Sequence, residues 1–224
     1  MITHISTSDG SSSLYIEELN ETYHSRHGAK VESEHVFLKE GLDQLVGLDH
    51  IRVLEVGMGT GLNVLLSCNY ALQRKTRIHL TTLEPFPIPA YLIAHLNYAE
   101  LLDNKTASEW FSTIHQSVWE KEHQLHSNFS FQKLKCKAEA FLGSEKFDII
   151  FYDAFGPHAQ PELWELSIFQ HLSKFIKPGG ILVTYCAQGQ FKRNLKACGF
   201  KVERLPGPPG KREMTRGVYT PSEF

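Results

Sequence analysis

The sequence predicts an α/β fold in which a mostly parallel sheet is covered by helices on both faces. Short apolar runs of strand length alternate with longer segments of helical periodicity along most of the chain. A glycine-rich turn joins the first clear strand to the first clear helix. Strands that alternate with helices form parallel sheets with helices on each face. A length of 224 residues suits one sizeable domain, or one domain with a small extension.

The middle of the chain opens this alternation. Strands are expected at Ile51–Val56 and Ile78–Leu83, and helices at Leu62–Gln73 and Pro89–Leu102. The second helix would have a proline in its first turn, a favoured position. The polar stretch from residue 103 to 128 is expected to be partly helical, because Trp110, Phe111, Ile114 and Val118 fall on one face.

The second half continues the same order. The expected strands are Phe129–Leu134, Phe147–Tyr152, Ile181–Cys186 and Phe200–Leu205. The expected helices are Glu162–Phe175, which Pro178-Gly179-Gly180 would stop, and Gln190–Ala197. Pro206–Gly210 must be a loop because it is built of proline and glycine. After it, Arg216–Thr220 is expected to return as an antiparallel strand.

The N-terminal residues break the rhythm, so we expect an extension or lid at residues 1–48 and the main domain at 49–224. Leu14–Ile16 predicts a short strand, and Glu32–Val46 predicts an amphipathic helix. Between them, residues 23–29 are polar and aromatic without a clear period. This segment is either a surface loop or a lid over the binding crevice, and in the second case His24 and His27 are candidate contacts.

Composition excludes several classes of protein. The net charge is −2, so any contact with nucleic acid requires a local basic patch. The four cysteines contain no Cys-x-x-Cys pair, which argues against a zinc site and a disulfide framework and suits reduced thiols in the cytoplasm. The histidines show no ligand spacing, so no metal is expected. No stretch approaches the length of a membrane span, and the polar N-terminus lacks the order of a signal peptide.

The glycine-rich turn indicates a ligand site. Gly57, Gly59 and Gly61 alternate after the strand, whereas the dinucleotide fingerprint reads Gly-x-Gly-x-x-Gly. Glu55 precedes them and would repel a pyrophosphate, but it suits a cationic ligand such as the amino acid end of S-adenosylmethionine. Glu84 ends the next strand, where a carboxylate can accept hydrogen bonds from both ribose hydroxyls. The bland alternative is a tight strand-to-helix turn without a ligand.

Asp153 stands at the end of the strand Phe147–Tyr152. Ligands of open α/β sheets bind beyond the carboxyl ends of the strands, so this acid is a candidate for holding a reactive group. Pro157 and Pro161 stiffen the loop that follows. The alternative is that Asp153 only caps the loop or the next helix.

Four segments resemble the tRNA 5-methylaminomethyl-2-thiouridine methyltransferases, and they are Glu55–Asn63, Tyr152–Pro157, Pro161–Trp164 and Gly210–Met214. The similarity covers most of the chain, including His35–Leu38 and Pro178–Gly180. The alternating glycines are shared with all class I methyltransferases, and the other segments are far more specific. The chain resembles the stand-alone form of the family, without a fused flavin oxidase domain.

The resemblance implies a Rossmann-like class I methyltransferase with S-adenosyl-L-methionine as cofactor and tRNA as partner. It implies N-methylation of the aminomethyl group of 5-aminomethyl-(2-thio)uridine at the wobble position, after a separate enzyme has made that group. The cofactor-binding residues it implies are Glu55, Gly57, Met58, Gly59, Gly61, Asn63, Glu84, Ala138, Asp153 and Phe155. Many class I enzymes place an acid near the adenine amino group, but here Lys137 stands there, so backbone groups and stacking are expected instead.

Methyl transfer from a sulfonium is an in-line displacement in which positioning dominates. The catalytic residue is expected to be Asp153, which would hold the amine, aim its lone pair and take up its proton. Tyr152 and Phe155 would flank the site, because aromatic faces attract cations. The expected substrate contacts are Tyr23, His24, His27, Phe155, Pro157, Lys211 and Arg212.

Basic residues crowd the last quarter of the chain, at Lys192, Arg193, Lys196, Lys201, Arg204, Lys211, Arg212 and Arg216. The loop from Gly207 to Met214 is expected to face RNA phosphates, while the helix residues among them could be only a solvated face. Trp110 and Trp164 are expected in the core. The alternatives are a small-molecule amine methyltransferase, a nicotinamide-dependent oxidoreductase and a non-catalytic RNA-binding module. The glycine spacing and Glu55 argue against the oxidoreductase.

Overall fold

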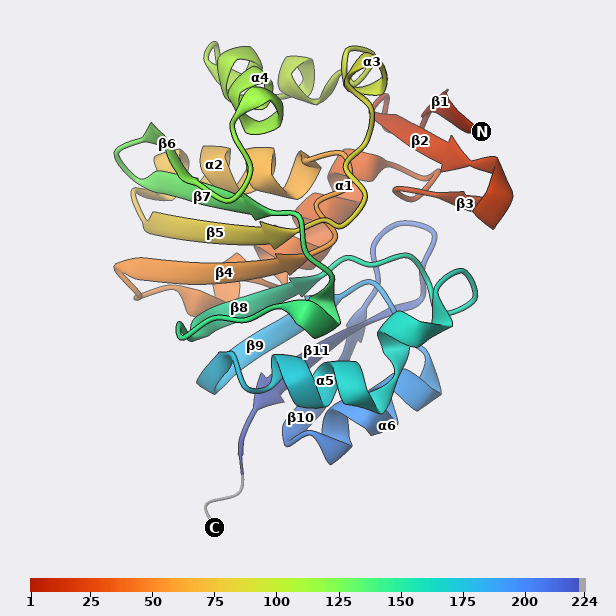
Figure 1. Cartoon of the computed structure of the whole chain (residues 1–224), viewed down its shortest axis with the longest axis vertical. Helices are drawn as coiled ribbons and strands as arrows, with labels where there is room; N and C mark the ends of the chain where they lie inside the picture. The colour runs from red at the N-terminus through yellow and green to blue at the C-terminus, as the bar shows by residue number, and fades with distance from the viewer. Residues whose placement is uncertain (222–224) are drawn as a thin grey trace.

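The computed structural model describes residues 1–221 and is built on an eight-stranded sheet in the order β10-β11-β9-β8-β4-β5-β7-β6 (Figure 1). The strands of this sheet are β4 (His50–Val56), β5 (Arg77–Leu83), β6 (Glu122–His126), β7 (Phe129–Leu134), β8 (Phe147–Tyr152), β9 (Ile176–Thr184), β10 (Phe200–Pro206) and β11 (Glu213–Tyr219).

The centre of the sheet is parallel and both of its edges are antiparallel. The chain enters at β4, adds β5 and β7 on one side, and then crosses back to place β8 and β9 on the other. Val56 is level with Leu83 of β5 and with Tyr152 of β8, so these three strands end together. Open α/β sheets bind ligands at such a reversal of strand order.

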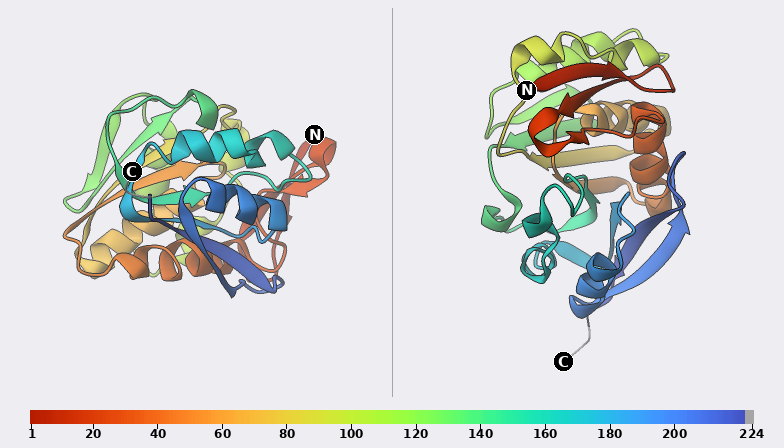
Figure 2. Two further views of the ribbon diagram at one scale, coloured as in Figure 1. Left: turned by 90° about the horizontal axis from the view of Figure 1, so that it is seen from below. Right: turned by 90° about the vertical axis from the view of Figure 1, so that its right-hand side faces the viewer.

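Helices cover both faces of the sheet, as Figure 2 shows, and the predicted α/β fold is confirmed. On one face lie α2 (Leu62–Arg74) and α4 (Ala107–Gln116), and on the other α5 (Leu166–Leu172) and α6 (Gly189–Ala197). Successive strand residues point to opposite faces. Val53 accordingly packs in the first core and Leu54 in the second. Trp110 and Trp164 are buried in these cores, as predicted.

The N-terminal residues form a separate three-stranded antiparallel sheet of β1 (Ile2–Ser6), β2 (Ser12–Ile16) and β3 (Glu21–Thr22). The right-hand view of Figure 2 shows this sheet in front of the carboxyl ends of the parallel strands. The predicted helix Glu32–Val46 is wrong in its bounds and its regularity. It begins earlier as α1 (Ala29–Ser33), widens into a π turn at Glu34–Lys39, and ends in a 3₁₀ turn at Leu42–Leu45.

Two long predicted helices are interrupted. Pro89–Leu102 becomes α3 (Ala90–Ile93) and a 3₁₀ turn at Tyr98–Leu101, because Asn97 between them binds the N-terminal sheet. Its side chain accepts the Ser12 N–H at 2.8 Å and donates to the Gly10 carbonyl at 2.9 Å. The extended backbone of Glu165 splits the other helix into a 3₁₀ turn at Pro161–Trp164 and α5.

The break in the helix at Glu165 lets Trp164 bind the loop that follows β8. The Trp164 indole N–H donates to the Phe155 carbonyl at 2.8 Å, and the Trp164 carbonyl accepts from the Asn194 amide at 2.9 Å. These contacts hold the turn in place and a continuous helix would lose them. Further 3₁₀ turns lie at Glu17–Leu19 and Ala138–Ala140.

Three smaller predictions also differ from the structure. The edge strand β6 was not predicted, because its alternating polar residues carry little apolar signal. Val118 lies beyond the end of α4 and is 59% exposed rather than on its buried face. The prolyl-glycine stretch 178–180 does not stop a helix, which ends at Leu172. It forms an irregular part of β9, where the register with β8 shifts.

Candidate active site

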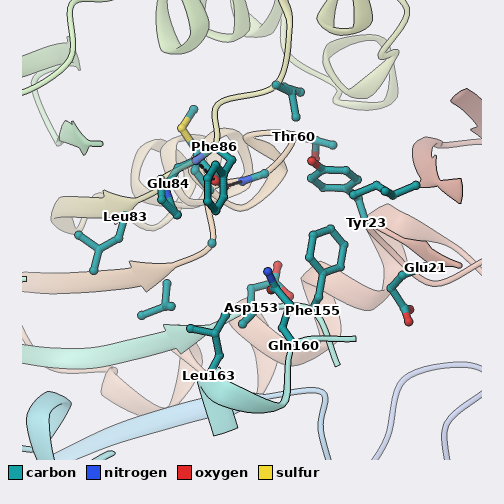
Figure 3. A pocket seen from close by; sticks show the side chains of 18 of the residues that line it. Glu21, Tyr23, Thr60, Leu83, Glu84, Phe86, Asp153, Phe155, Gln160 and Leu163 are labelled. Carbon is teal, nitrogen blue, oxygen red and sulfur yellow. Dashed lines mark hydrogen bonds between the residues drawn. The ribbon is translucent and has the colours of Figure 1, made fainter. Parts of the chain in front are cut away.

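A cavity of about 700 Å³ opens where β4, β5 and β8 end. Its size lies in the range of small-molecule sites. The loops after these strands, the N-terminal segment around β3 and the loop between β10 and β11 all contribute to the wall. Figure 3 shows Glu84 and Phe86 on one side of the cavity, Tyr23 and Phe155 on the other, and Asp153 between the strand ends.

The glycine turn brings the ends of β4 and β8 into contact. Gly57 has a φ of +92°, and a Cβ there would lie 2.6 Å from the Asp153 carbonyl oxygen. Gly59 has a φ of +47°, and a Cβ would lie 2.9 Å from the Tyr23 ring. Residues with side chains rarely adopt positive φ, so both positions require glycine. The turn therefore exposes bare backbone to the cavity.

Glu84 follows β5 and faces the cavity with both carboxylate oxygens anchored. Oε2 accepts the Gly59 N–H at 3.0 Å, and Oε1 accepts the Phe86 N–H at 2.9 Å. Each oxygen of a carboxylate can accept a further hydrogen bond. Burial raises the pKa of Glu84, although these two N–H groups oppose that shift. Two adjacent acceptors in a fixed orientation match a pair of vicinal hydroxyls.

Asp153 is held at the end of β8 by helix α2. The Asn63 side-chain amide donates to its Oδ2 at 2.8 Å. Among the described residues, Oδ1 accepts no side-chain hydrogen bond, which leaves it available to a ligand. Burial raises the pKa of Asp153 to about 7, with a further contribution from the negative charge of Glu32. The carboxyl is therefore poised to gain or lose a proton near neutral pH.

Glu55 lies behind the cavity wall rather than on it, because its side chain is fully buried in the sheet. The Thr82 hydroxyl donates to its Oε2 at 2.5 Å. Burial raises the pKa of Glu55 to about 8, so the carboxyl is mostly protonated at neutral pH.

Residues 23–25 of the N-terminal segment form part of the wall, as the lid interpretation expects. Tyr23 meets Phe155 edge to face, with ring centroids 5.0 Å apart. His24 is buried, and its Nε2 lies 2.7 Å from the Thr60 hydroxyl. Burial lowers the pKa of His24 to about 4, so its ring is neutral. His27 lies outside the cavity and packs against Gly210 instead.

One group in the wall had no sequence signal. Glu32 of α1 is buried, and its Oε1 lies 2.6 Å from the Lys211 Nζ. Lys211 also sits over the ring of Tyr185, 3.7 Å from its centroid. Glu32 and Lys211 are 179 residues apart in the chain, so no local pattern connects them. Phe86 was also missed, although the prolines around it, directly after Glu84, mark an exposed and rigid loop.

The structure brings most predicted site residues together. The cavity wall contains Gly57, Met58, Gly59, Glu84, Ala138, Asp153, Phe155, Tyr23, His24 and Lys211. The wall does not contain Glu55, Gly61, Asn63, Pro157, His27 or Arg212. Of these, Asn63 touches Asp153, and Arg212 is exposed on the loop beside Lys211. Lys137 and Glu139 flank Ala138 in the wall and pair with each other at 3.8 Å.

Residues 102–220 match the family described as S-adenosyl-L-methionine-dependent methyltransferase. The chain belongs to this family. The methyltransferase is 30% identical over 89% of its length to the tRNA 5-methylaminomethyl-2-thiouridine biosynthesis bifunctional protein MnmC of Aromatoleum aromaticum. It is 31% identical over 92% of its length to the protein of the same name from Leptospira interrogans. It spans about a third of the length of these relatives, 33% and 34% respectively.

A solved structure is similar along the whole methyltransferase. The crystal structure of MnmC2 from Aquifex aeolicus has a TM-score of 0.81 and 25% identity, and it matches 100% of this chain and 73% of its own. The predicted resemblance and the class I fold, with its antiparallel C-terminal strands, are confirmed. None of the helices that the structure describes is long and apolar enough to cross a membrane.

The cavity fits the cofactor of the methyltransferase family. Gly57 and Gly59 line the cavity without side chains, so a ligand can approach the backbone of the turn closely. Glu84 presents two carboxylate oxygens to the same cavity. Its hydrogen bond from the Gly59 N–H holds it next to the glycine turn. Phe86 beside it adds an aromatic surface, and this residue is 68% exposed. Backbone cradle, paired acceptors and aromatic face are what an adenosyl group requires.

Proposed function

We propose that this methyltransferase transfers a methyl group to the aminomethyl nitrogen of 5-aminomethyl-(2-thio)uridine at the wobble position of tRNA. The observation that carries the proposal is the half-buried Asp153, anchored by Asn63 and facing the cavity beside Phe155. The printed names of the relatives describe biosynthesis of this modified uridine in tRNA. Action on tRNA also implies a cytoplasmic location.

The chain divides the work between two parts. Residues 49–224 would form the catalytic domain, and residues 1–48 would cover its site through Tyr23 and His24. Gly57, Gly59 and Glu84 would hold S-adenosylmethionine, with Ala138 and the backbone near it beside the adenine. When bound, this cofactor supplies an electrophilic methyl group on a sulfonium.

Asp153 would prepare the substrate amine. A primary alkylamine is mostly protonated at neutral pH, and an ammonium has no lone pair with which to attack. The Asp153 carboxylate, with its pKa raised to about 7 by burial, can take one proton from the ammonium and hold it on the carboxyl. The neutral amine then forms the nitrogen–carbon bond as the carbon–sulfur bond breaks, and the secondary ammonium product loses its extra proton to solvent.

The basic C-terminal quarter separates into paired and exposed groups. Lys192, Lys211 and Arg216 pair with Glu213, Glu32 and Glu203 and are therefore poor candidates for phosphate contacts. The exposed basic residues are Arg193, Lys196, Lys201, Arg204 and Arg212. We propose that these exposed groups, Arg212 above all, contact tRNA phosphates. Such contacts position a polymer and make its binding salt-dependent.

The test is methyl transfer from labelled S-adenosylmethionine to three acceptors. They are an anticodon stem–loop with 5-aminomethyluridine, the same RNA with plain uridine, and the free 5-aminomethyluridine nucleoside. The proposal expects label in the modified RNA alone. Efficient labelling of the free nucleoside would favour a small-molecule amine methyltransferase. No labelling of the modified RNA by protein that binds the cofactor would refute the proposal.

Asp153→Asn is the matched variant for this assay. Asparagine keeps the shape of the side chain and removes its capacity to take up a proton. We expect methyl transfer to fall by at least about 100-fold, the usual range for loss of a general base. Cofactor binding by calorimetry should change much less, and an equal loss of both would reassign Asp153 to cofactor binding.

A further inference from the structure

The wall of the cavity contains a buried carboxylate, on α1, that already holds a primary ammonium group. Glu32 has a side chain only 8% exposed. Its Oε2 accepts the Ser25 N–H at 2.8 Å, and its Oε1 lies 2.6 Å from the Lys211 Nζ. The Lys211 ammonium rests on the face of Tyr185, 3.7 Å from the ring centroid. Glu32, Tyr185 and Lys211 all line the same cavity as Asp153.

Hydrogen bonds hold Glu32 and Tyr185 in place, whereas the side chain of Lys211 can move. The Ser25 N–H orients Glu32, and the Tyr185 hydroxyl donates to the Ala154 carbonyl at 2.8 Å, directly after Asp153. Lys211 in contrast extends from the loop between β10 and β11, and its side chain is 32% exposed. A lysine ammonium is a point charge on a flexible stem. The fixed part is therefore a carboxylate with an aromatic face, which together bind alkylammonium ions.

We propose that Glu32 and Tyr185 form the docking subsite for the cationic aminomethyl group, and that Lys211 occupies this subsite until the substrate displaces it. The inference rests on the proposed function and deepens it. A substrate ammonium would meet Glu32 first and would then give its proton to Asp153. Separate carboxylates divide the work, because Glu32 attracts the cation while Asp153 takes up its proton and leaves a neutral amine.

A purely structural ion pair is the competing explanation. Glu32 and Lys211 join α1 to the loop between β10 and β11, and their pair could serve only to hold these segments together. In that case loss of either partner would loosen the same contact and would lower the affinity for RNA with and without the amine by the same factor. If Lys211 instead competes with the substrate, removal of the two partners should change recognition of the amine in opposite directions.

The experiment measures the binding of two anticodon stem–loops in the presence of S-adenosylhomocysteine, with no methyl transfer. One RNA carries 5-aminomethyluridine and the other plain uridine. The discrimination ratio is the Kd of the plain RNA divided by the Kd of the modified RNA, so a high ratio means a preference for the amine. Glu32→Gln should lower this ratio at least about 10-fold, the value of one hydrogen bond to a charged group. Lys211→Met should raise it about 3-fold or more, because the competitor for the subsite is gone.

The double variant E32Q/K211M separates attraction by Glu32 from repulsion by Lys211. If Glu32 binds the amine, the ratio stays low in the double variant. If the single change E32Q acted only by freeing the Lys211 charge, the ratio returns to the wild-type value, and the inference is overturned. Arg212→Ala is the control on the same loop. It should weaken the binding of both RNAs by the same factor and leave the discrimination ratio unchanged. E32Q and the double variant decide the matter even if K211M alone does not fold.

The wild-type protein separates this inference from the proposed function. If the wild type binds both RNAs equally and does not methylate the modified one, the proposed function itself has failed. If the wild type discriminates and methylates, but E32Q and K211M lower the affinity for both RNAs by the same factor, only the inference fails and the ion pair is structural.

Discussion

Asn63→Ala should move the pH dependence of methyl transfer without touching the cavity wall. The Asn63 amide donates to Asp153 Oδ2 at 2.8 Å from the first turn of α2, and Asn63 itself does not line the cavity. This hydrogen bond stabilises the ionised carboxyl and partly offsets the effect of burial on its pKa. Without it, the pKa of Asp153 must rise above its present value of about 7.

The size of this shift follows from the strength of the bond. A hydrogen bond to a charged group contributes about 1.5–3 kcal/mol, and one pKa unit corresponds to about 1.4 kcal/mol. The pKa of Asp153 should therefore rise by about one to two units in the variant. At pH 7 the ionised fraction would fall from about a half to about a tenth or less, and the rate of transfer about 5-fold or more. Above pH 9 the two proteins should converge to within about 2-fold.

The assay is single-turnover methyl transfer to the modified stem–loop between pH 6 and 9.5, at saturating cofactor and RNA. Asn69→Ala is the matched control, because Asn69 lies on the same helix and its side chain accepts a bond from Asn104, remote from the cavity. Its profile should coincide with that of the wild type. A uniform loss of rate in Asn63→Ala, with the same midpoint, would refute the role assigned to Asn63.

Three further predictions concern the turn and the buried ionisable groups. Gly57→Ala should weaken cofactor binding at least about 10-fold, since its Cβ would lie 2.6 Å from the Asp153 carbonyl; Gly179→Ala, with a φ of +79° but no atom within 4 Å, should leave the calorimetric Kd unchanged. Glu55 has a pKa of about 8 in the folded chain against 4.5 as its ordinary value, so its burial destabilises the fold progressively from pH 4.5 to 8. Glu55→Gln should therefore raise the free energy of unfolding by about 3 kcal/mol at pH 7 and by little at pH 4.5, and equal urea midpoints at pH 7 would contradict this. His24 has a pKa of about 4 against 6.5, so its neutral ring contributes stability that is lost as the pH falls from 6.5 to 4. The free energy of unfolding should therefore fall less in His24→Gln than in the wild type between pH 7 and pH 4. An equal fall in both proteins, measured by urea unfolding, would show that His24 does not titrate in this way.

The central strands and the acids at their ends could be predicted because their signals are local. The apolar run of β8 was predicted with its bounds, and β4 and β5 each begin only one residue earlier than expected. Glu84 and Asp153 follow directly after such runs, so the carboxyl-end rule of α/β sheets places them in one crevice. The structure confirms that both line the same cavity.

The remaining features depend on contacts between distant segments. Asn97 interrupts a helical pattern only because its amide binds the β1–β2 turn, and Trp164 does so because its indole binds the loop of Phe155. Neither partner is visible in a local window of sequence. Lys211 was expected to face RNA on the basis of charge density, but the structure turns it inward toward Glu32. Charge counts cannot reveal such pairing, because they do not show which basic residues meet an acid in the fold.

The insertion of β11 between β9 and β10 has a consequence for the order in which the protein is made. Strand β11 pairs with both neighbours, through Thr215 with Thr184 of β9 and with Arg204 of β10. During synthesis the ribosome releases β10 before its partner β11, so this edge of the sheet cannot form until β11 has also emerged. Lys211 lies just before β11 and its partner Glu32 is made 179 residues earlier. The wall of the cavity formed by Glu32 and Lys211 is therefore incomplete until the loop before β11 has been made, and a nascent chain that stops before this loop lacks it.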